Sequence, residues 1–121
     1  MNIITWFEIP VVGFNRARTF YESVLDISIH VHEVNGALMG VLGDATRGIS
    51  GAIIKHEWYK PSEHGVLLYL NAGEDVMPAL ARAEAAGGTV LIPKTKVSED
   101  FGYMAVFRDP DGNRIALRST G

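Results

Sequence analysis

Apolar side chains along this chain follow the periodicity of strands in some segments and of helices in others, and the first half shows both. Residues 3–9 are rich in β-branched and aromatic side chains and stop at Pro10, which is typical of a strand. Residues 14–25 carry apolar side chains three, four and seven positions apart, which predicts a helix with one buried face. Asp26 stands where a left-handed helix stop is expected. Further strands are predicted at residues 27–33, 37–42 and 51–56, separated by Gly36 and by a loop over residues 43–48.

The second half of the chain repeats this order of elements. Val66 to Leu70 is a continuous apolar run, which predicts a buried strand. An alanine-rich helix is predicted over residues 74–86, with Glu74 and Asp75 in its first turn and Gly87-Gly88 at its end. Strands are then predicted at residues 89–92, 103–108 and 113–118, with a turn at Asp109-Pro110-Asp111-Gly112-Asn113 before the last one.

The two halves match each other in sequence as well as in order. Residues 36–41 align with residues 102–107 at a shift of 66 positions, and the helix stop at Asp26 matches Gly87 at a shift of 61. An internal repeat of this kind is a strong guide to the fold. We therefore predict an α+β fold of two βαβββ modules in one domain of 121 residues, with module 1 at about 1–58 and module 2 at about 64–121.

The charge, the cysteine content and the lengths of the apolar runs exclude several classes of protein. The net charge is −3 and the lysines and arginines are scattered, which argues against a nucleic-acid surface. The chain contains no cysteine, so thiolate metal sites and cysteine nucleophiles are excluded and a reducing compartment is favoured. No apolar run approaches the roughly 20 residues that span a bilayer, and the first residues lack a signal-peptide pattern. We expect a soluble, cytoplasmic protein with no membrane partner.

Three motifs carry a family resemblance that covers almost the whole chain. They are Ile9-Pro10-Val11-Val12-Gly13-Phe14 running into Phe20-Tyr21-Glu22-Ser23-Val24-Leu25, then Ala85-Ala86-Gly87-Gly88 with Leu91-Ile92-Pro93, and finally Asp109-Pro110-Asp111-Gly112-Asn113. In these motifs the sequence resembles the vicinal oxygen chelate superfamily of glyoxalase I, extradiol dioxygenases and bleomycin-resistance proteins. The resemblance implies curved mixed sheets around a cavity that takes a small molecule. It also implies a homodimer, with modules paired within one chain or across two.

The resemblance further implies four inward positions that bind a divalent ion in the members that use a metal. These positions fall on Trp6, Gly51 or Ala52, Val66 and Ala116, and none of these side chains is a metal donor. A register shift of two residues keeps the inward direction. It brings in only one carboxylate, that of Glu8, beside Ile4, Leu68, Arg114 and Arg118. We therefore predict a protein without the family's metal and without another cofactor.

Glu8 and Trp6 are the candidate site residues on the first strand, because alternation places both on the same face. If Glu8 faces the cavity, it is a candidate general base. The alternatives are an ion pair with Arg118 or Arg114, or partial exposure at a strand end. Trp6 fits either an apolar wall for a flat ligand or a plain core position.

The histidines and the segment between the modules leave their roles open. His30 and His32 share one face of a predicted edge strand. They are either solvent-facing residues or a pair of ligands. His56 and His64 flank the Trp58-Tyr59-Lys60-Pro61-Ser62 crossover and fit a surface loop or a cavity rim. The crossover fits a lid, a contact with a second subunit, or ordinary packing on the core.

From these observations we predict a mostly apolar cavity of a few hundred Å³. The leading interpretation is a metal-independent protein of the glyoxalase and bleomycin-resistance type that binds a small, mostly apolar or aromatic molecule. The alternative is a lyase or isomerase of glyoxalase type with Glu8 as the general base, and a partner-binding role is the third possibility. The residues expected to line the cavity are Trp6, Glu8, Trp58, Val66, Leu68, Ala116 and Arg118.

Overall fold

A computed structural model describes residues 2–44 and 48–121, so residues 45–47 of the predicted loop lie outside the described residues. The chain forms two four-stranded mixed sheets, ordered β1-β4-β3-β2 and β5-β8-β7-β6, and each is crossed by one helix. This confirms the α+β fold of two βαβββ modules. Module 1 contains β1 (Trp6–Pro10), α1 (Phe14–Leu25), β2 (Ile29–Val34), β3 (Ala37–Leu42) and β4 (Ser50–Lys55). Module 2 contains β5 (Leu68–Asn71), α2 (Val76–Ala85), β6 (Thr89–Ser98), β7 (Gly102–Arg108) and β8 (Arg114–Ser119).

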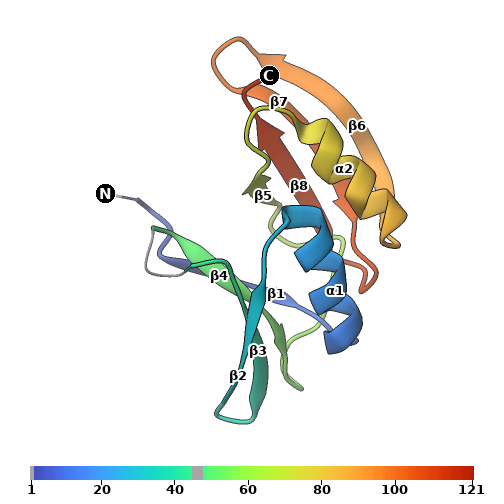
Figure 1. The fold of residues 1–121 in the computed structure, drawn as a ribbon. Helices are drawn as coiled ribbons and strands as arrows, with labels where there is room; N and C mark the ends of the chain where they lie inside the picture. Colours follow the sequence, from blue (N-terminus) through green and yellow to red (C-terminus); the bar gives the residue numbers. More distant parts are fainter. Residues whose placement is uncertain (1, 45–47) are drawn as a thin grey trace.

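The two helices lie side by side, and the two sheets spread away from them (Figure 1). In each module the first strand pairs in parallel with the last, β1 with β4 and β5 with β8, and the remaining pairs are antiparallel. Each helix packs on one face of its own sheet. We call the opposite face of each sheet, which carries no helix, its open face.

Backbone conformation confirms the internal repeat. Asp26 ends α1 with a φ of 53°, and Gly87 follows α2 with a φ of 106°, so both helices stop in the left-handed region. Gly36 and Gly102, 66 positions apart, also share positive φ values of 81° and 88°, just before β3 and at the first residue of β7. The repeat therefore preserves the points where the backbone must turn, and these points require glycine or a tolerant residue.

Three predicted boundaries in module 2 are wrong. The helix begins at Val76, and Asp75 is its N-cap, where its carboxylate accepts a hydrogen bond of 3.0 Å from the Met77 backbone N–H. That bond, together with Lys94, lowers the pKa of Asp75. β6 continues to Ser98 through several register irregularities, which a short apolar pattern does not reveal. Val66 lies ahead of β5 and is 96% exposed.

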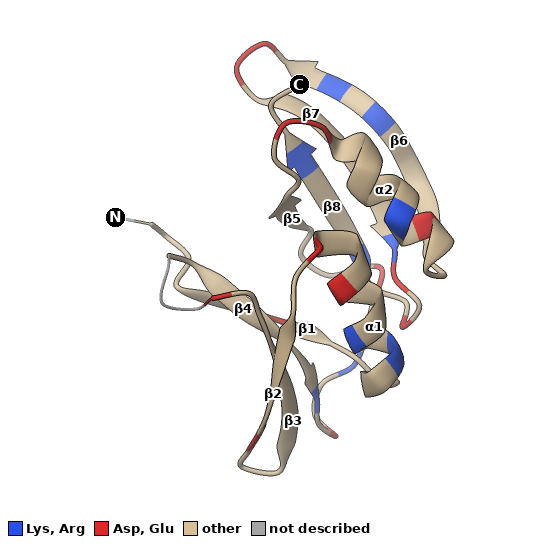
Figure 2. Ribbon diagram, viewed as in Figure 1, with Lys and Arg blue, Asp and Glu red and all other residues tan. Residues whose placement is uncertain are grey.

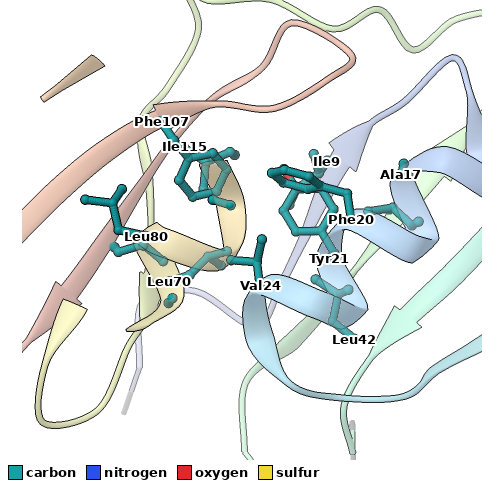
Figure 3. Close-up of a cluster of buried hydrophobic side chains, with 14 of the residues drawn as sticks. Ile9, Ala17, Phe20, Tyr21, Val24, Leu42, Leu70, Leu80, Phe107 and Ile115 are labelled. Carbon is teal, nitrogen blue, oxygen red and sulfur yellow. The ribbon is translucent and has the colours of Figure 1, made fainter. Parts of the chain in front are cut away.

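One hydrophobic core serves both modules (Figure 3). Phe20 of α1 packs against Phe107 of β7, with ring centroids 5.6 Å apart, and against Tyr21 at 4.9 Å in an edge-on arrangement. Side chains of the two helices and of both sheets meet in this cluster, so the two modules share it as a common core. The buried members labelled in the figure are Ile9, Ala17, Phe20, Tyr21, Val24, Leu42, Leu70, Leu80, Phe107 and Ile115.

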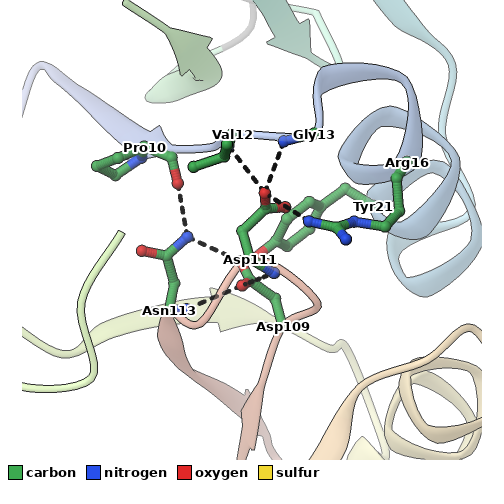
Figure 4. Close-up of polar contacts among 8 residues, drawn as sticks. All are labelled: Pro10, Val12, Gly13, Arg16, Tyr21, Asp109, Asp111 and Asn113. Carbon is green, nitrogen blue, oxygen red and sulfur yellow. Dashed lines mark hydrogen bonds and ion pairs between the residues drawn. The ribbon is translucent and has the colours of Figure 1, made fainter. Parts of the chain in front are cut away.

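Hydrogen bonds and an ion pair connect the turn before β8, in module 2, to the start of α1 in module 1 (Figure 4). One carboxylate oxygen of Asp111 accepts hydrogen bonds from the backbone N–H groups of Val12 and Gly13, at 2.8 and 2.9 Å, and an ion pair from Arg16 at 2.9 Å. Within the turn Gly112 has a positive φ of 99°, a conformation that glycine adopts without a steric penalty. The turn predicted from the sequence therefore also holds the two modules together.

A second carboxylate of the same turn is buried beneath it. Asp109 accepts a hydrogen bond of 2.6 Å from the phenol of Tyr21 and another of 3.0 Å from the side-chain amide of Asn113. The Asn113 amide also donates to the Pro10 carbonyl at 2.7 Å. Burial, and then the neighbouring Asp109 carboxylate, raise the pKa of Tyr21 well above its ordinary value.

Charged residues of both signs occur on both helices, and basic residues stand on β6 and β8 (Figure 2).

Within the described part of the chain, no helix is long and apolar enough to cross a membrane.

Candidate functional site

Glu8 lies in the middle of β1, and its neighbours decide which way it points. Phe7 and Ile9 pack into the shared core, so strand alternation places Trp6 and Glu8 on the open face of the first sheet. The prediction that these two side chains share a face is confirmed. Trp6 is 38% exposed, so the interpretation of Trp6 as a plain core residue is wrong.

Two neutral donors hold the Glu8 carboxylate in place. The Tyr59 phenol donates to Oε1 at 2.9 Å, and the Trp6 indole Nε1 donates to Oε2 at 3.4 Å. The hydrogen bond to Glu8 and the negative charge of that carboxylate raise the pKa of Tyr59. With one donor on each oxygen, the orientation of the carboxylate is defined.

The segment after β4 turns three rings toward one another beside this carboxylate. The His56 ring lies edge-on to Trp58 at 5.2 Å and to Tyr59 at 5.9 Å between centroids. A backbone hydrogen bond of 2.9 Å from Tyr59 to the His56 carbonyl closes the turn, and the Trp58 N–H donates to His56 Nδ1 at 3.2 Å. This local turn is what brings Tyr59 within reach of Glu8.

Glu8 and the three rings border a hollow of about 270 Å³, just below the usual range for small-molecule sites. A larger hollow of about 640 Å³ adjoins it and shares Ala37, His56 and Tyr59. The smaller hollow is lined by Glu8, Val34, Asn35, Ala37, Met39, Ile54, His56, Trp58 and Tyr59.

The remaining predicted site residues lie elsewhere. Ala116 and Arg118 are on the open face of the second sheet, since they alternate with the core residues Ile115 and Leu117. Among the lining residues of the Glu8 hollow, all belong to residues 8–59. The structure therefore groups Glu8 with Trp58 in one hollow and Trp6 beside them, but separates them from Ala116 and Arg118.

Leu68 corrects the expected register of the second module. It pairs with Ile115 of β8 and packs against the shared core, so it points away from the open face, and Tyr69 takes the open-face position beside Ala116. The run from Val66 to Leu70 is apolar almost throughout, so it contains no alternation from which the inward face can be predicted. The prediction that Val66 and Leu68 line the cavity of Trp6 and Glu8 is wrong.

The alternative of an ion pair between Glu8 and Arg118 or Arg114 is not realised among the described residues. Arg118 donates to the Phe101 carbonyl at 2.8 Å and lies over the Phe101 ring at 4.4 Å. Arg114 donates to the Gly65 carbonyl at 3.2 Å. Tyr59, the actual partner of Glu8, is 51 positions away along the chain. Nothing in the spacing of the sequence signals this contact.

The four histidines take different positions. His30 and His32 are exposed on β2, which is an edge strand as predicted. His56 lines both hollows, while the backbone N–H of His64 donates to the Ser62 hydroxyl at 3.0 Å in the crossover. The sequence leaves His56 between a surface loop and a cavity rim, and in the structure it lines both hollows.

The residues present do not fit the family's divalent ion. Tryptophan, glycine or alanine, valine and alanine occupy the expected ligand positions, and the corrected register of β5 brings in Tyr69, which is also no typical ligand. Across residues 2–44 and 48–121, no group of three or more histidine, aspartate or glutamate side chains is arranged to hold a metal ion.

The family model of the Glyoxalase/Bleomycin resistance protein/Dioxygenase superfamily matches residues 3–117. The chain belongs to this superfamily. Comparison with curated proteins found no match. Since members of this superfamily share a fold and differ in their chemistry, membership does not identify the ligand or the reaction.

Solved structures show the same fold at low sequence identity. A glyoxalase/bleomycin resistance protein from Albidiferax ferrireducens T118 superposes with a TM-score of 0.72 at 20% identity, over 96% of this chain and 97% of that one. TnmS3, an antibiotic binding protein from Streptomyces sp. CB03234, gives 0.67 at 23% identity, over 100% and 98%. A V278E mutant of glyoxalase I from Zea mays gives 0.70 at 19% identity over 95% of this chain, which spans 45% of the maize protein.

Proposed function

We propose that this superfamily member binds a small, mostly apolar or aromatic molecule on the open face of its first sheet, without a metal ion. One observation carries the proposal: an oriented carboxylate, Glu8, borders a hollow that is otherwise lined largely by aromatic and apolar side chains. Such a lining with one well-placed polar group is typical of small-molecule sites. The similarity to TnmS3, an antibiotic binding protein, is in keeping with this class of function.

A ligand screen that follows tryptophan fluorescence tests the proposal. Both tryptophans of the chain, Trp6 and Trp58, lie at the site, so a bound aromatic molecule should change the emission. Trp6→Ala should weaken binding by roughly 1–3 kcal/mol through lost apolar contact. It should leave the fold intact, because Trp6 lies outside the core cluster. Ligands that bind equally well to the Trp6→Ala and Trp58→Ala variants would contradict this location.

Metal independence is tested separately by thermal unfolding. Zinc, nickel, cobalt or manganese should leave the melting temperature nearly unchanged, because an ion stabilises the native state only when it binds there. A stoichiometric rise in melting temperature that a chelator reverses would refute metal independence.

A glyoxalase-type lyase or isomerase with Glu8 as the general base is the second candidate, and the defined orientation of the Glu8 carboxylate favours it. Glu8→Gln separates the two functions. An enzyme would lose turnover while ligand binding largely persists, whereas a binding protein has no turnover to lose and changes only in affinity.

We further propose that the protein acts in the cytoplasm as a homodimer whose second copy covers the open faces. The support is the aromatic surface that these faces leave exposed, including Trp6, Tyr69 and Phe101. In such a dimer the open face of one copy's second sheet would cover the cavity of the other copy's first sheet. It would bring Ala116 to that cavity, while Arg118 stays engaged with the Phe101 carbonyl of its own module.

A further inference from the structure

No lysine or arginine of residues 2–44 and 48–121 balances the charge of Glu8. Its two recorded partners, the Tyr59 phenol and the Trp6 indole, are neutral donors. No arginine or lysine among the described residues forms an ion pair with it, and Arg114 and Arg118 are engaged with carbonyl oxygens of their own module. A half-buried carboxylate in this state still has acceptor capacity, because two donors occupy only part of its lone pairs.

The surfaces around this carboxylate suit a positive charge on an organic body. The aromatic rings of Trp58 and Tyr59 border the hollow, and ring faces attract cations through their quadrupole. Trp58 is 82% exposed, so its ring is available to a ligand. Met39 and Ile54 form the apolar part of the lining, which favours a hydrocarbon portion over a bare ion.

We propose that the ligand of the Glu8 hollow is an organic cation, a protonated amine attached to a small apolar or aromatic body. The ammonium group donates to the free lone pairs of Glu8 and lies near the Trp58 and Tyr59 rings, while the body contacts Met39 and Ile54. This inference rests on the proposed binding function of the same site. It adds the charge of the ligand, which the superfamily's shared fold does not specify.

The same arrangement disfavours the other charge classes. An anionic ligand would place a second negative charge beside Glu8, with no lysine or arginine among the residues that line this hollow. A divalent metal ion would find too few donors, because no group of three or more histidine, aspartate or glutamate side chains is arranged to hold one among the described residues.

A matched set of three soluble probes tests the charge preference. They are 2-phenylethylamine, which is a cation at neutral pH, the neutral 2-phenylethanol, and the anionic 3-phenylpropanoate. The two indole N–H signals of a ¹⁵N-labelled sample report directly on the site, since Trp6 and Trp58 are the chain's only tryptophans. We expect the cation to bind roughly tenfold more tightly than the alcohol, as one added charge-assisted hydrogen bond predicts. The anion should bind most weakly.

Glu8→Gln and Glu57→Gln form the variant and its matched control. Both remove one negative charge, but Glu57 lines only the neighbouring hollow. Glu8→Gln should bring the affinities for amine and alcohol to within about twofold of each other, since the neutral amide loses the charge-assisted bond. Glu57→Gln should keep the preference. Retained dispersion of the indole signals in Glu8→Gln shows that the variant is folded.

Three outcomes would overturn the inference. Equal binding of amine and alcohol, or tighter binding of the anion, would refute the cation preference and leave the proposed binding function intact. A preference that survives Glu8→Gln would place the cation elsewhere. No shift of either indole signal with any probe at about 10 mM, which would saturate a site with a Kd of 1 mM, would refute the cation inference and count against the binding site itself.

Discussion

Tyr21 shows how a single side chain ties the two modules together. It is fully buried in α1, and its phenol donates to Asp109 in the turn before β8, 88 positions later in the chain. The hydrogen bond satisfies a carboxylate that the turn itself has buried, and the ring packs edge-on against Phe20. A buried charged group without such a partner would be costly.

We predict that Tyr21→Phe lowers the free energy of unfolding by about 1–3 kcal/mol at neutral pH, because Asp109 loses one of its donors. The raised pKa of Tyr21 also predicts a pH effect. Above about pH 10 the unfolded chain loses the phenol proton while the folded chain keeps it, so the unfolded state is favoured and stability falls as the pH rises. Urea unfolding at pH 7 and pH 10.5 should show a smaller fall for the variant.

Tyr69→Phe is the control, since Tyr69 is 43% exposed and its hydroxyl forms no hydrogen bond with residues 2–44 and 48–121. It should change stability by no more than about 0.5 kcal/mol, as is usual for surface substitutions. Equal effects of the two variants would show that Tyr21 does not act through Asp109.

At the scale of elements, α1 depends on module 2 at both of its ends. The helix has no side-chain cap at Gly13, no acidic residue in its first turn and no basic residue in its last. Asp111 supplies the missing negative charge at the N-terminus, and Arg82 of α2 donates to the Ser23 and Val24 carbonyls at 2.7 and 2.9 Å. Both charges have the sign that the helix dipole favours.

We therefore predict that Asp111→Ala lowers the free energy of unfolding by about 1.5–3 kcal/mol, the range for hydrogen bonds to a charged group. Arg82→Met, which keeps most of the aliphatic stem, should cost about 1–2 kcal/mol through the carbonyls it leaves without a donor. Urea unfolding measures both effects, and amide exchange should become faster at the corresponding end of α1.

Asp100→Ala is the matched control for the first variant, because Asp100 stands in an exposed turn. Its stability should stay within about 0.5 kcal/mol of the parent protein. If Asp111→Ala behaved like Asp100→Ala, the turn would not anchor α1.

At the scale of the whole molecule, the shared core and the polar contacts of the turn cover the helix-bearing face of both sheets. The open faces remain, with an oriented carboxylate on one and the Arg118–Phe101–Tyr69 contacts on the other. Large exposed aromatic surfaces of this kind mark interaction sites. This arrangement motivates the proposed dimer. In a two-fold symmetric pair, the first sheet of each copy can face the second sheet of the other, so that both open faces of both copies are covered.

Phe101→Glu should shift the dimer toward a monomer of 13.2 kDa in sedimentation at micromolar concentration, since a charge would enter the covered surface. Met77→Glu is the control, because Met77 is similarly exposed but lies on α2, away from the open faces. A monomeric parent protein, or equal dissociation of both variants, would contradict the proposed arrangement.

The sequence by itself determined the elements of this protein and their repetition. The helical spacing over residues 14–25, the left-handed stops and the turn before β8 are local properties, since each depends on the conformational preferences of neighbouring residues. Alternation also placed Trp6 and Glu8 on one face. It did so because β1 contains a polar residue between core positions, which makes its two faces distinguishable.

Only the tertiary structure decided the register of β5 and the partners of the charged groups. The run from Val66 to Leu70 is apolar on both faces, so its own pattern does not show which face is buried. The pairing of β5 with β8 decides this and directs the Leu68 side chain toward the core. The contacts of Glu8 with Tyr59, of Asp111 with Val12 and of Arg82 with Ser23 join residues more than 50 positions apart. Such contacts depend on how distant segments of the chain pack together, which no local preference encodes.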